Sequence, residues 1–267
     1  MQLYHHPYSM DSQKVRIALE EEGVDYTSFH ANPLTGKNMD TFFFRINISG
    51  KLPVFQNGAH RICDTIDIIQ YIHRIALLSS RLDHQEDTSD EVIELMWKIQ
   101  KWDPRLFTLS HVPTKYRNFV AKFLRRVAIA RMADAPDLAS AYHTKLREAY
   151  ETEDRLRNER EVTQNEEQLT CLLDEMENIL NQTEYLSGQE FGMADYVFVP
   201  VLARIALLNL EEVYIANREK VAEYWKAVQK RPSYKVVIGK YFRGWRKYQT
   251  LFKTVCFLII RSAFRKY

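Results

Sequence analysis

Residues 51–65 read KLPVFQNGAHRICDT and combine a proline beside apolar residues, an Asn-Gly pair and a short second apolar run. Proline cannot donate a hydrogen bond to a strand ladder, so Pro53 marks the first position of a strand. Asn57-Gly58 between the two runs is typical of a hairpin turn. The stretch therefore predicts a hairpin of strands at residues 53–55 and 60–62, with a helix that starts at Asp64.

On both sides of this hairpin, strand-like and helix-like segments alternate. Residues 12–22 place apolar side chains on one helical face, and Gly23 follows as a helix stop. The order strand, helix, strand, helix, two strands, helix predicts an α/β domain over residues 1–79. The other expected elements are strands at 2–5 and 24–30, an irregular helix at 36–47 and a helix at 64–77.

Helical periodicity dominates from about residue 90, after a polar linker at residues 79–89. Residues 193–208 are almost wholly apolar, which predicts the buried central helix of a second, all-helical domain at 90–238. Residues 138–167 are highly charged and poor in apolar side chains, so we expect them to be partly mobile. The other expected helices lie at 91–102, 112–132, 169–181 and 221–230.

Charge is unevenly distributed along the chain. The 37 Lys and Arg residues exceed the 35 Asp and Glu residues by two, but residues 240–267 hold eight of the basic residues and no acidic one. Residues 1–239 therefore carry 29 basic and 35 acidic side chains, and the chain is an acidic body with a basic tail. Three distant cysteines, a start unlike a signal peptide and the lack of about 20 consecutive apolar residues predict a cytoplasmic protein.

The tail at residues 240–267 has the pattern of a basic amphipathic helix with an aromatic-rich apolar face. We expect it to associate peripherally with an anionic membrane, best the cytosolic face of the plasma membrane, where Cys256 is placed to carry a palmitoyl chain. Docking on the acidic body is the alternative, and nucleic acid is disfavoured because no RNA-binding module is present. The basic side chains are Arg243, Arg246, Lys247, Arg261 and Arg265, opposite Tyr241, Trp245, Tyr248, Phe252, Val255 and Ile259.

Several spaced motifs stand out: YSMDSQKVRIALEE at 8–21, KLPV at 51–54, DT at 64–65 and YLSGQEFGMAD at 185–195. Together they resemble the serine-type glutathione transferases. The resemblance implies a thioredoxin-like, glutathione-binding domain at 1–79 and an all-helical domain for acceptor substrates at 90–238. The insertion with Arg125-Arg126, Tyr142 and Leu146-Arg147 resembles that of the plant tetrachlorohydroquinone dehalogenase-like (TCHQD) class.

Ser9 stands just before the first helix, within the first of these motifs. The resemblance implies that its hydroxyl donates a hydrogen bond to the sulfur of glutathione, while the helix N-terminus adds positive potential. The residues alone favour a simpler role, because a serine at this position caps a helix. Tyr4 and Tyr8 offer rival hydroxyls, with packing in the strand as the alternative for Tyr4.

Two further contacts with glutathione are implied near the hairpin. A cis bond before Pro53 would expose the backbone N–H and C=O of Leu52, which the resemblance assigns to the cysteinyl unit of glutathione. Asp64 and Thr65 open the third helix, whose N-terminus would hold the γ-glutamyl unit. The alternatives are a structural cis-proline in a tight turn and an ordinary helix cap.

For the glycyl carboxylate of glutathione, the resemblance points to Lys51 and the pair Lys37 and Asn38. Asn38 occupies the place of the family's usual basic residue, and Lys37 would substitute for that residue by a shift of one position. Solvated surface lysines are the alternative.

Three departures from the family pattern bear on function. Tetrachlorohydroquinone dehalogenases use a cysteine two residues after the serine, where this chain has Asp11. Without that thiol no mixed disulfide with glutathione forms there, and Asp11 adds negative charge beside the required thiolate. Cys63 is a poorly placed substitute and is expected to be a small buried hydrophobe. Gly192 replaces the hydroxyl residue that forms a capping box with Asp195.

The sequence thus predicts a glutathione transferase that joins the thiol of glutathione to small hydrophobic electrophiles, with the family's homodimer as an expected assembly. A non-catalytic ligand-binding or scaffold protein of the same fold at a membrane is the alternative. No metal site is expected, because His5 and His6 face opposite sides of a strand. Five aromatic side chains are candidates for an acceptor pocket, or else for ordinary core: Trp97, Trp102, Phe107, Tyr116 and Phe119.

Overall fold

The computed structural model describes residues 1–80, 89–242 and 256. Its first domain consists of β1 Gln2–His5, α1 Met10–Glu21, β2 Thr27–His30, η1 Pro33–Thr35, η2 Lys37–Met39, α2 Thr41–Ile46, β3 Val54–Asn57, β4 His60–Ile62 and α3 Thr65–Ser80. The rest consists of α4 Asp90–Lys101, α5 Pro104–Ser110, α6 Thr114–Asp134, η3 Pro136–Leu138, α7 Ala139–Arg157, α8 Glu159–Leu180, α9 Met193–Leu207, α10 Glu211–Tyr214, α11 Glu219–Val228, α12 Pro232–Tyr234, η4 Lys235–Gly239 and α13 Lys240–Phe242.

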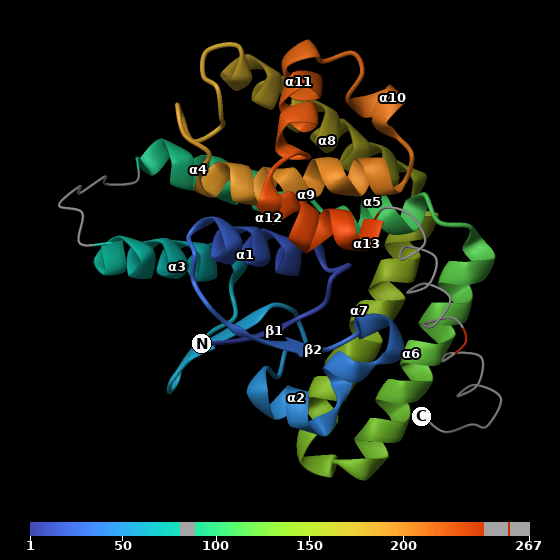
Figure 1. The fold of residues 1–267 in the computed structure, drawn as a ribbon. Helices are drawn as coiled ribbons and strands as arrows, with labels where there is room; N and C mark the ends of the chain where they lie inside the picture. The colour runs from blue at the N-terminus through green and yellow to red at the C-terminus, as the bar shows by residue number, and fades with distance from the viewer. Residues whose placement is uncertain (81–88, 243–255, 257–267) are drawn as a thin grey trace.

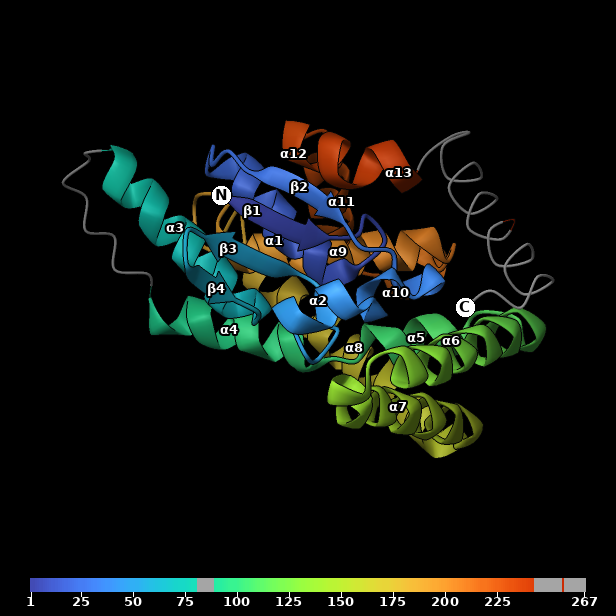
Figure 2. The same cartoon turned by 90° about the horizontal axis from the view of Figure 1, so that it is seen from below.

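The first domain is built on a four-stranded sheet in the order β2-β1-β3-β4, in which only β1 and β2 are parallel. Helices α1 and α3 cover one face of the sheet, and α2 lies on the opposite face (Figure 1). Figure 2 looks onto the strands from the side of α2, with α1 behind them. The prediction of an α/β thioredoxin-like domain followed by an all-α domain is confirmed.

The hairpin predicted from Asn57-Gly58 is present. In it β3 pairs with β4, with Phe55 opposite Ile62. Gly58 has a φ of 59°, in the left-handed region that glycine enters without a steric penalty. The peptide bond between Leu52 and Pro53 is cis, as the proline at the start of the strand suggested.

Helix α9 forms the centre of the second domain and packs against α1 and α4. The carboxylate of Asp195 accepts a hydrogen bond from the N–H of Gly192 at 3.0 Å, and Ser187 Oγ accepts one from the N–H of Ala194 at 3.1 Å. A Cβ at position 192 would lie 2.8 Å from Ser187 Oγ. The expectation of an incomplete cap was wrong, because Ser187 supplies the missing hydroxyl in the space that Gly192 leaves.

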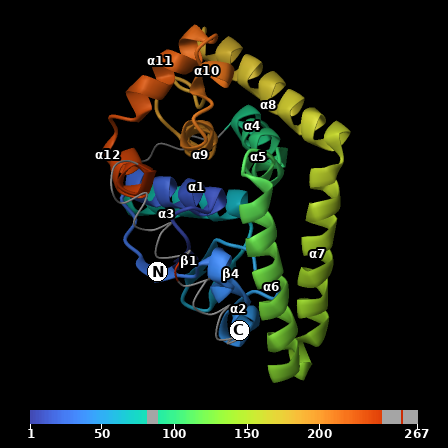
Figure 3. The same cartoon turned by 90° about the vertical axis from the view of Figure 1, so that its right-hand side faces the viewer.

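Residues 138–167, for which we expected partial mobility, contain α7 and the first part of α8. Figure 3 shows α6 and α7 side by side, running past the sheet and α2. Tyr142 of α7 is fully buried, its ring stacks on Phe44 of α2 at 4.5 Å between centroids, and its hydroxyl donates to the carbonyl oxygen of Met39 at 2.9 Å. A few buried anchors therefore hold a helix whose remaining surface is charged.

Most of the predicted basic tail, residues 243–255 and 257–267, lies outside the described residues, so its membrane association stays a prediction. The described start of the tail, residues 240–242, returns to the first domain. The Tyr8 hydroxyl donates to the carbonyl oxygen of Tyr241 at 3.2 Å, and the Tyr8 ring stacks on Phe242 at 5.4 Å. Among the described helices, none is both long and apolar enough to cross a bilayer.

The histidines of β1 predict a loss of stability in mild acid. Burial lowers the pKa of His5 to about 3, with a smaller contribution from Arg16, and lowers that of His6 to about 4. An unfolded histidine titrates near 6.5, so below that pH the unfolded chain binds more protons and stability falls as the pH falls. We expect a loss of about 2 kcal/mol for each histidine between pH 7.5 and pH 5.

Urea unfolding at these two pH values measures this loss. The variant His6→Asn should flatten the dependence of the free energy of unfolding on pH, whereas His143→Gln, at an exposed position of α7, should leave it unchanged. Equal stability of the unaltered chain at pH 7.5 and pH 5 would show that neither histidine is held neutral by the fold.

Candidate functional site

Three loops that carry candidate residues meet at one edge of the sheet. Because β1 and β3 are antiparallel, and β3 and β4 likewise, the end of β1, the start of β3 and the end of β4 share this edge. The adjoining loops carry Ser9, Leu52 with Pro53, and Asp64 with Thr65. The topology therefore brings together residues that are spread over positions 9 to 65 of the sequence.

Ser9 is the N-cap of α1, with extended backbone angles and its Oγ accepting from the N–H of Ser12 at 3.4 Å. The capping role that the residues alone favoured is thus present. It does not exclude the other role, because Oγ is the acceptor in this bond and its hydroxyl hydrogen remains for donation to a bound atom. Tyr4 packs between Phe29 and Phe43, which confirms its packing role.

A partly buried cation lies behind the Ser9 loop. Arg204 of α9 donates from Nη2 to the carbonyl oxygen of Tyr8 at 2.7 Å and from Nη1 to Thr108 Oγ1 at 3.1 Å. Burial lowers the pKa of Arg204 to about 10, against the opposing effect of Asp11, so the group is still charged at neutral pH. A cation beside this loop favours the anionic form of a thiol placed there.

Asp11 is neutralised by a partner that the sequence analysis did not consider. Its Oδ1 accepts from Lys14 Nζ at 3.2 Å and from Gln100 Nε2 at 3.1 Å, and Lys14 Nζ also donates to Gln100 Oε1 at 2.5 Å. Burial lowers the pKa of Lys14. Asp11 opposes this effect by raising the pKa, and Asp64 does so to a smaller extent. The expected harm of Asp11 to a thiolate is therefore reduced, because its charge is shared with a fully buried ammonium group.

The edge formed by Leu52 is open for pairing. Within the described residues, neither the N–H nor the C=O of Leu52 has a hydrogen-bond partner. Asp64 is the N-cap of α3, with Oδ1 accepting from the N–H groups of Ile66 at 2.8 Å and Asp67 at 3.2 Å. The N–H of the buried Thr65 has no partner among the described residues and is available to an anion at this helix end.

The predicted ligands of the glycyl carboxylate lie in different settings. Lys37 is exposed and pairs with Asp40 at 2.7 Å. The amide of Asn38 donates to the carbonyl oxygen of Gly50 at 2.8 Å, so it braces the loop before the cis-proline. Lys51 is exposed at the end of that loop. Of the three, Lys51 stands nearest in the chain to the open edge of Leu52.

The aromatic candidates for an acceptor pocket divide into two groups. Trp102 and Phe107 are buried core residues, and Trp97, Tyr116 and Phe119 are exposed. Cys63 is exposed, which corrects its expected burial. A cavity of about 430 Å³ lies between α1 and the edge strand β2 and is also lined by Tyr241. No cluster of three or more potential metal ligands is present among the described residues.

Arg204, Lys14 and Gln100 were not among the predicted site residues, although the sequence holds a signal for two of them. Arg204 is a lone cation in the apolar run 193–208, which is rare unless the charge has a partner. Lys14 follows Asp11 by three positions, the spacing of neighbours on a helix. Gln100 is one polar residue of an amphipathic helix and carries no such signal.

Family models agree with this architecture. The model of the glutathione S-transferase N-terminal domain matches residues 3–79, and that of the glutathione S-transferase C-terminal domain matches residues 138–232. The structure of Gtt2 from Saccharomyces cerevisiae superposes with a TM-score of 0.62 at 19% identity, covering 89% of this chain and all of the other. At that identity the likeness supports the fold alone.

Two sequence relatives are more specific. The chain is 26% identical to the tetrachloro-p-hydroquinone reductive dehalogenase of Sphingobium chlorophenolicum, over 87% of this chain and 93% of the relative. It is 59% identical to the glutathione S-transferase TCHQD of Arabidopsis thaliana, over the full length of both. Glutathione is the co-substrate that this family uses. The chain belongs to the glutathione S-transferase family and is a homologue of its TCHQD member.

Proposed function

We propose that this chain activates the thiol of glutathione through the hydroxyl of Ser9 and transfers the thiolate to small hydrophobic electrophiles. The observation that carries this proposal is the placement of Ser9 on the same sheet edge as Leu52. Among the described residues, the Ser9 hydroxyl donates no hydrogen bond and the backbone of Leu52 has no hydrogen-bond partner. A peptide thiol paired with Leu52 as an added strand would lie across this edge, beside the start of α1.

In the reaction, the S–H bond of glutathione loses its proton to solvent and the hydroxyl of Ser9 donates a hydrogen bond to the resulting sulfur anion. The thiolate then attacks the electrophilic carbon, forming a C–S bond as the leaving group departs with its electron pair. Arg204 and the N-terminus of α1 favour the anion, and Lys14 offsets the charge of Asp11.

Disulfide-based dehalogenation has little support in this chain. Position 11 carries a carboxylate that is bound to Lys14 and Gln100, not a thiol. A mixed disulfide with glutathione requires a cysteine at the site. The proposal is therefore conjugation rather than reductive chemistry.

Conjugation of glutathione to a chlorodinitrobenzene tests the role of Ser9. We expect Ser9→Ala to lower kcat/KM by about tenfold to a hundredfold, because the hydrogen bond from Ser9 to the thiolate of glutathione is lost. Ser9→Asp keeps an acceptor that caps α1 and should be as inactive as Ser9→Ala, which separates the chemistry from the cap.

The matched control is Tyr8→Phe, which removes the neighbouring rival hydroxyl and should retain the activity. Full activity in Ser9→Ala together with a loss in Tyr8→Phe would contradict the proposal. Binding of glutathione without any turnover would instead support a ligand-binding role of the fold.

A further inference from the structure

We propose that Lys145 of α7 binds the glycyl carboxylate of glutathione. This inference rests on the proposed function, because it adds one contact at the same site. The residue lies in the charged insertion of the second domain, far in sequence from the hairpin that opens the site. The second domain would thus take part in holding the co-substrate as well as the acceptor.

The orientation of the ligand follows from the two ends of the open edge. The N–H of Thr65 at the start of α3 suits the γ-glutamyl carboxylate, and the backbone of Leu52 suits the cysteinyl unit. An extended tripeptide held at these points directs its glycyl end away from α3. The chain on that side is the loop of Gly50 and Lys51, braced by Asn38.

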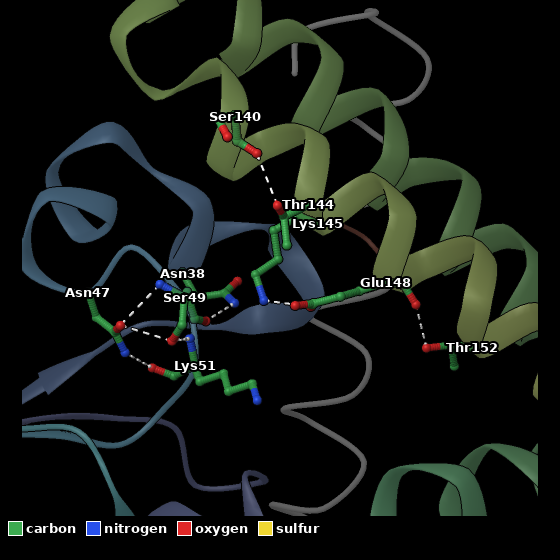
Figure 4. A network of polar contacts seen from close by, with 10 residues as sticks. Asn38, Asn47, Ser49, Lys51, Ser140, Thr144, Lys145, Glu148 and Thr152 are labelled. Atoms are coloured by element: carbon green, nitrogen blue, oxygen red, sulfur yellow. Dashed lines mark hydrogen bonds and ion pairs between the residues drawn. The ribbon is translucent and has the colours of Figure 1, made fainter.

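Lys145 reaches this loop from above (Figure 4). A Cβ built on Gly50 would lie 3.2 Å from Lys145 Cε and 3.3 Å from the carbonyl oxygen of Asn38, so the lysine stem rests against the glycine. Only 14% of the Lys145 side chain is exposed. Its ammonium group donates to Glu148 Oε2 at 2.7 Å, within the same helix.

The position of Lys145 is fixed by the docking of α7. Tyr142, three residues earlier, lies on the same helical face and is anchored by its stacking on Phe44 and its bond to Met39. Arg131 of α6 adds an ion pair with Asp40 at 2.9 Å. These contacts hold the helix pair against η2 and α2, so the reach of Lys145 is built into the fold.

The charges around Lys145 leave room for an added anion. Burial lowers the pKa of Lys145, Glu148 raises it, and the cations Lys51 and Arg105 lower it further. Lys51 and Arg105 thus act on Lys145 as like charges, while Glu148 is the carboxylate in contact with its ammonium group. A carboxylate from the ligand would reduce the mutual repulsion of the cations and gain a charge-assisted hydrogen bond.

The assignment also accounts for the asparagine at position 38. Its side-chain amide N–H donates to the carbonyl oxygen of Gly50. Its buried Oδ1, which can only accept a hydrogen bond, has no partner among the described residues. This side chain therefore braces the loop and presents no cation. Lys145 brings a cation to the same loop from another helix.

Glutathione and γ-glutamylcysteine, which lacks the glycine, are the probes that test this contact by calorimetry. We expect Lys145→Met to weaken the binding of glutathione by about tenfold and to leave the binding of γ-glutamylcysteine unchanged. Lys145→Arg, which keeps the charge, should retain most of the affinity. Lys122→Met removes an exposed lysine of α6 and should bind both ligands like the unaltered chain.

The outcomes separate the two proposals. An equal loss for both ligands in Lys145→Met, or no loss for either, overturns the role of Lys145 and leaves the proposed function standing. Failure of the unaltered chain to bind glutathione overturns the proposed function and, with it, this contact. Selective loss of glutathione binding supports both.

Discussion

Replacing Asp195 with alanine is expected to lower the free energy of unfolding by about 3–5 kcal/mol, because several buried donors lose their acceptor at once. The carboxylate is fully buried at the start of α9. It accepts from the N–H groups of Leu186 at 3.0 Å, Ser187 at 3.2 Å and Gly192 at 3.0 Å, and from the hydroxyl of Tyr224 at 2.8 Å. Asp195 therefore joins the loop before α9 to α11.

Urea unfolding followed by circular dichroism measures this effect. The matched control is Glu190→Ala, which removes an exposed acid from the same loop and should change the free energy by less than about 0.5 kcal/mol. Asp195→Asn keeps one acceptor oxygen but places an NH₂ group opposite N–H donors. Its loss in free energy of unfolding should therefore lie between those of Asp195→Ala and Glu190→Ala. A loss of about 1 kcal/mol or less in Asp195→Ala would show that water replaces the carboxylate easily.

Replacing Asp11 with alanine is expected to cost about 3 kcal/mol of stability, because it leaves the ammonium group of Lys14 buried without its carboxylate. The Lys14 side chain is 1% exposed and that of Asp11 is 35% exposed. The reverse change, Lys14→Met, should cost only about 1 kcal/mol, since solvent still reaches Asp11. The double variant should therefore be more stable than Asp11→Ala alone.

A double-mutant cycle from urea unfolding tests this coupling. Because burial holds the pKa of Lys14 below its unfolded value, the unfolded chain binds more protons, and stability rises with pH in that range. Without Asp11 this pKa falls further, so the penalty in Asp11→Ala should shrink as the pH is raised toward the unfolded lysine value near 10.4. Strictly additive costs with no dependence on pH would contradict the account.

Local signals made the first domain predictable. The Asn57-Gly58 turn, the proline that opens β3 and the glycine after α1 each act within a few residues, so the sequence alone locates the strands and their order. Ser9, Leu52 and Thr65 stand at the ends of elements that could be predicted locally, whereas their contacts with glutathione were implied only by the family resemblance. The structure places these residues on one edge.

The remaining features depend on contacts across long stretches of chain. Nothing within residues 138–167 reveals that Tyr142 is buried against Phe44, so a charged segment that is helical looked mobile. The reach of Lys145 depends on that docking. Asp11 illustrates a different difficulty, since Lys14 three residues later was visible but its burial was not. Local sequence signals thus predicted the secondary structure of residues 1–80, but they did not predict the polar contacts between the two domains.

The most direct test of Ser9 activation is the thiol pKa of bound glutathione, read from thiolate absorbance in the ultraviolet as a function of pH. We expect a pKa about one unit or more below the value of about 8.5 for a free thiol, corresponding to about 1.4 kcal/mol or more in favour of the thiolate. The shift should largely disappear in Ser9→Ala and persist in Tyr8→Phe. Bound glutathione with an unshifted pKa, or with an equal shift in Ser9→Ala, would contradict the claim that Ser9 activates the thiol.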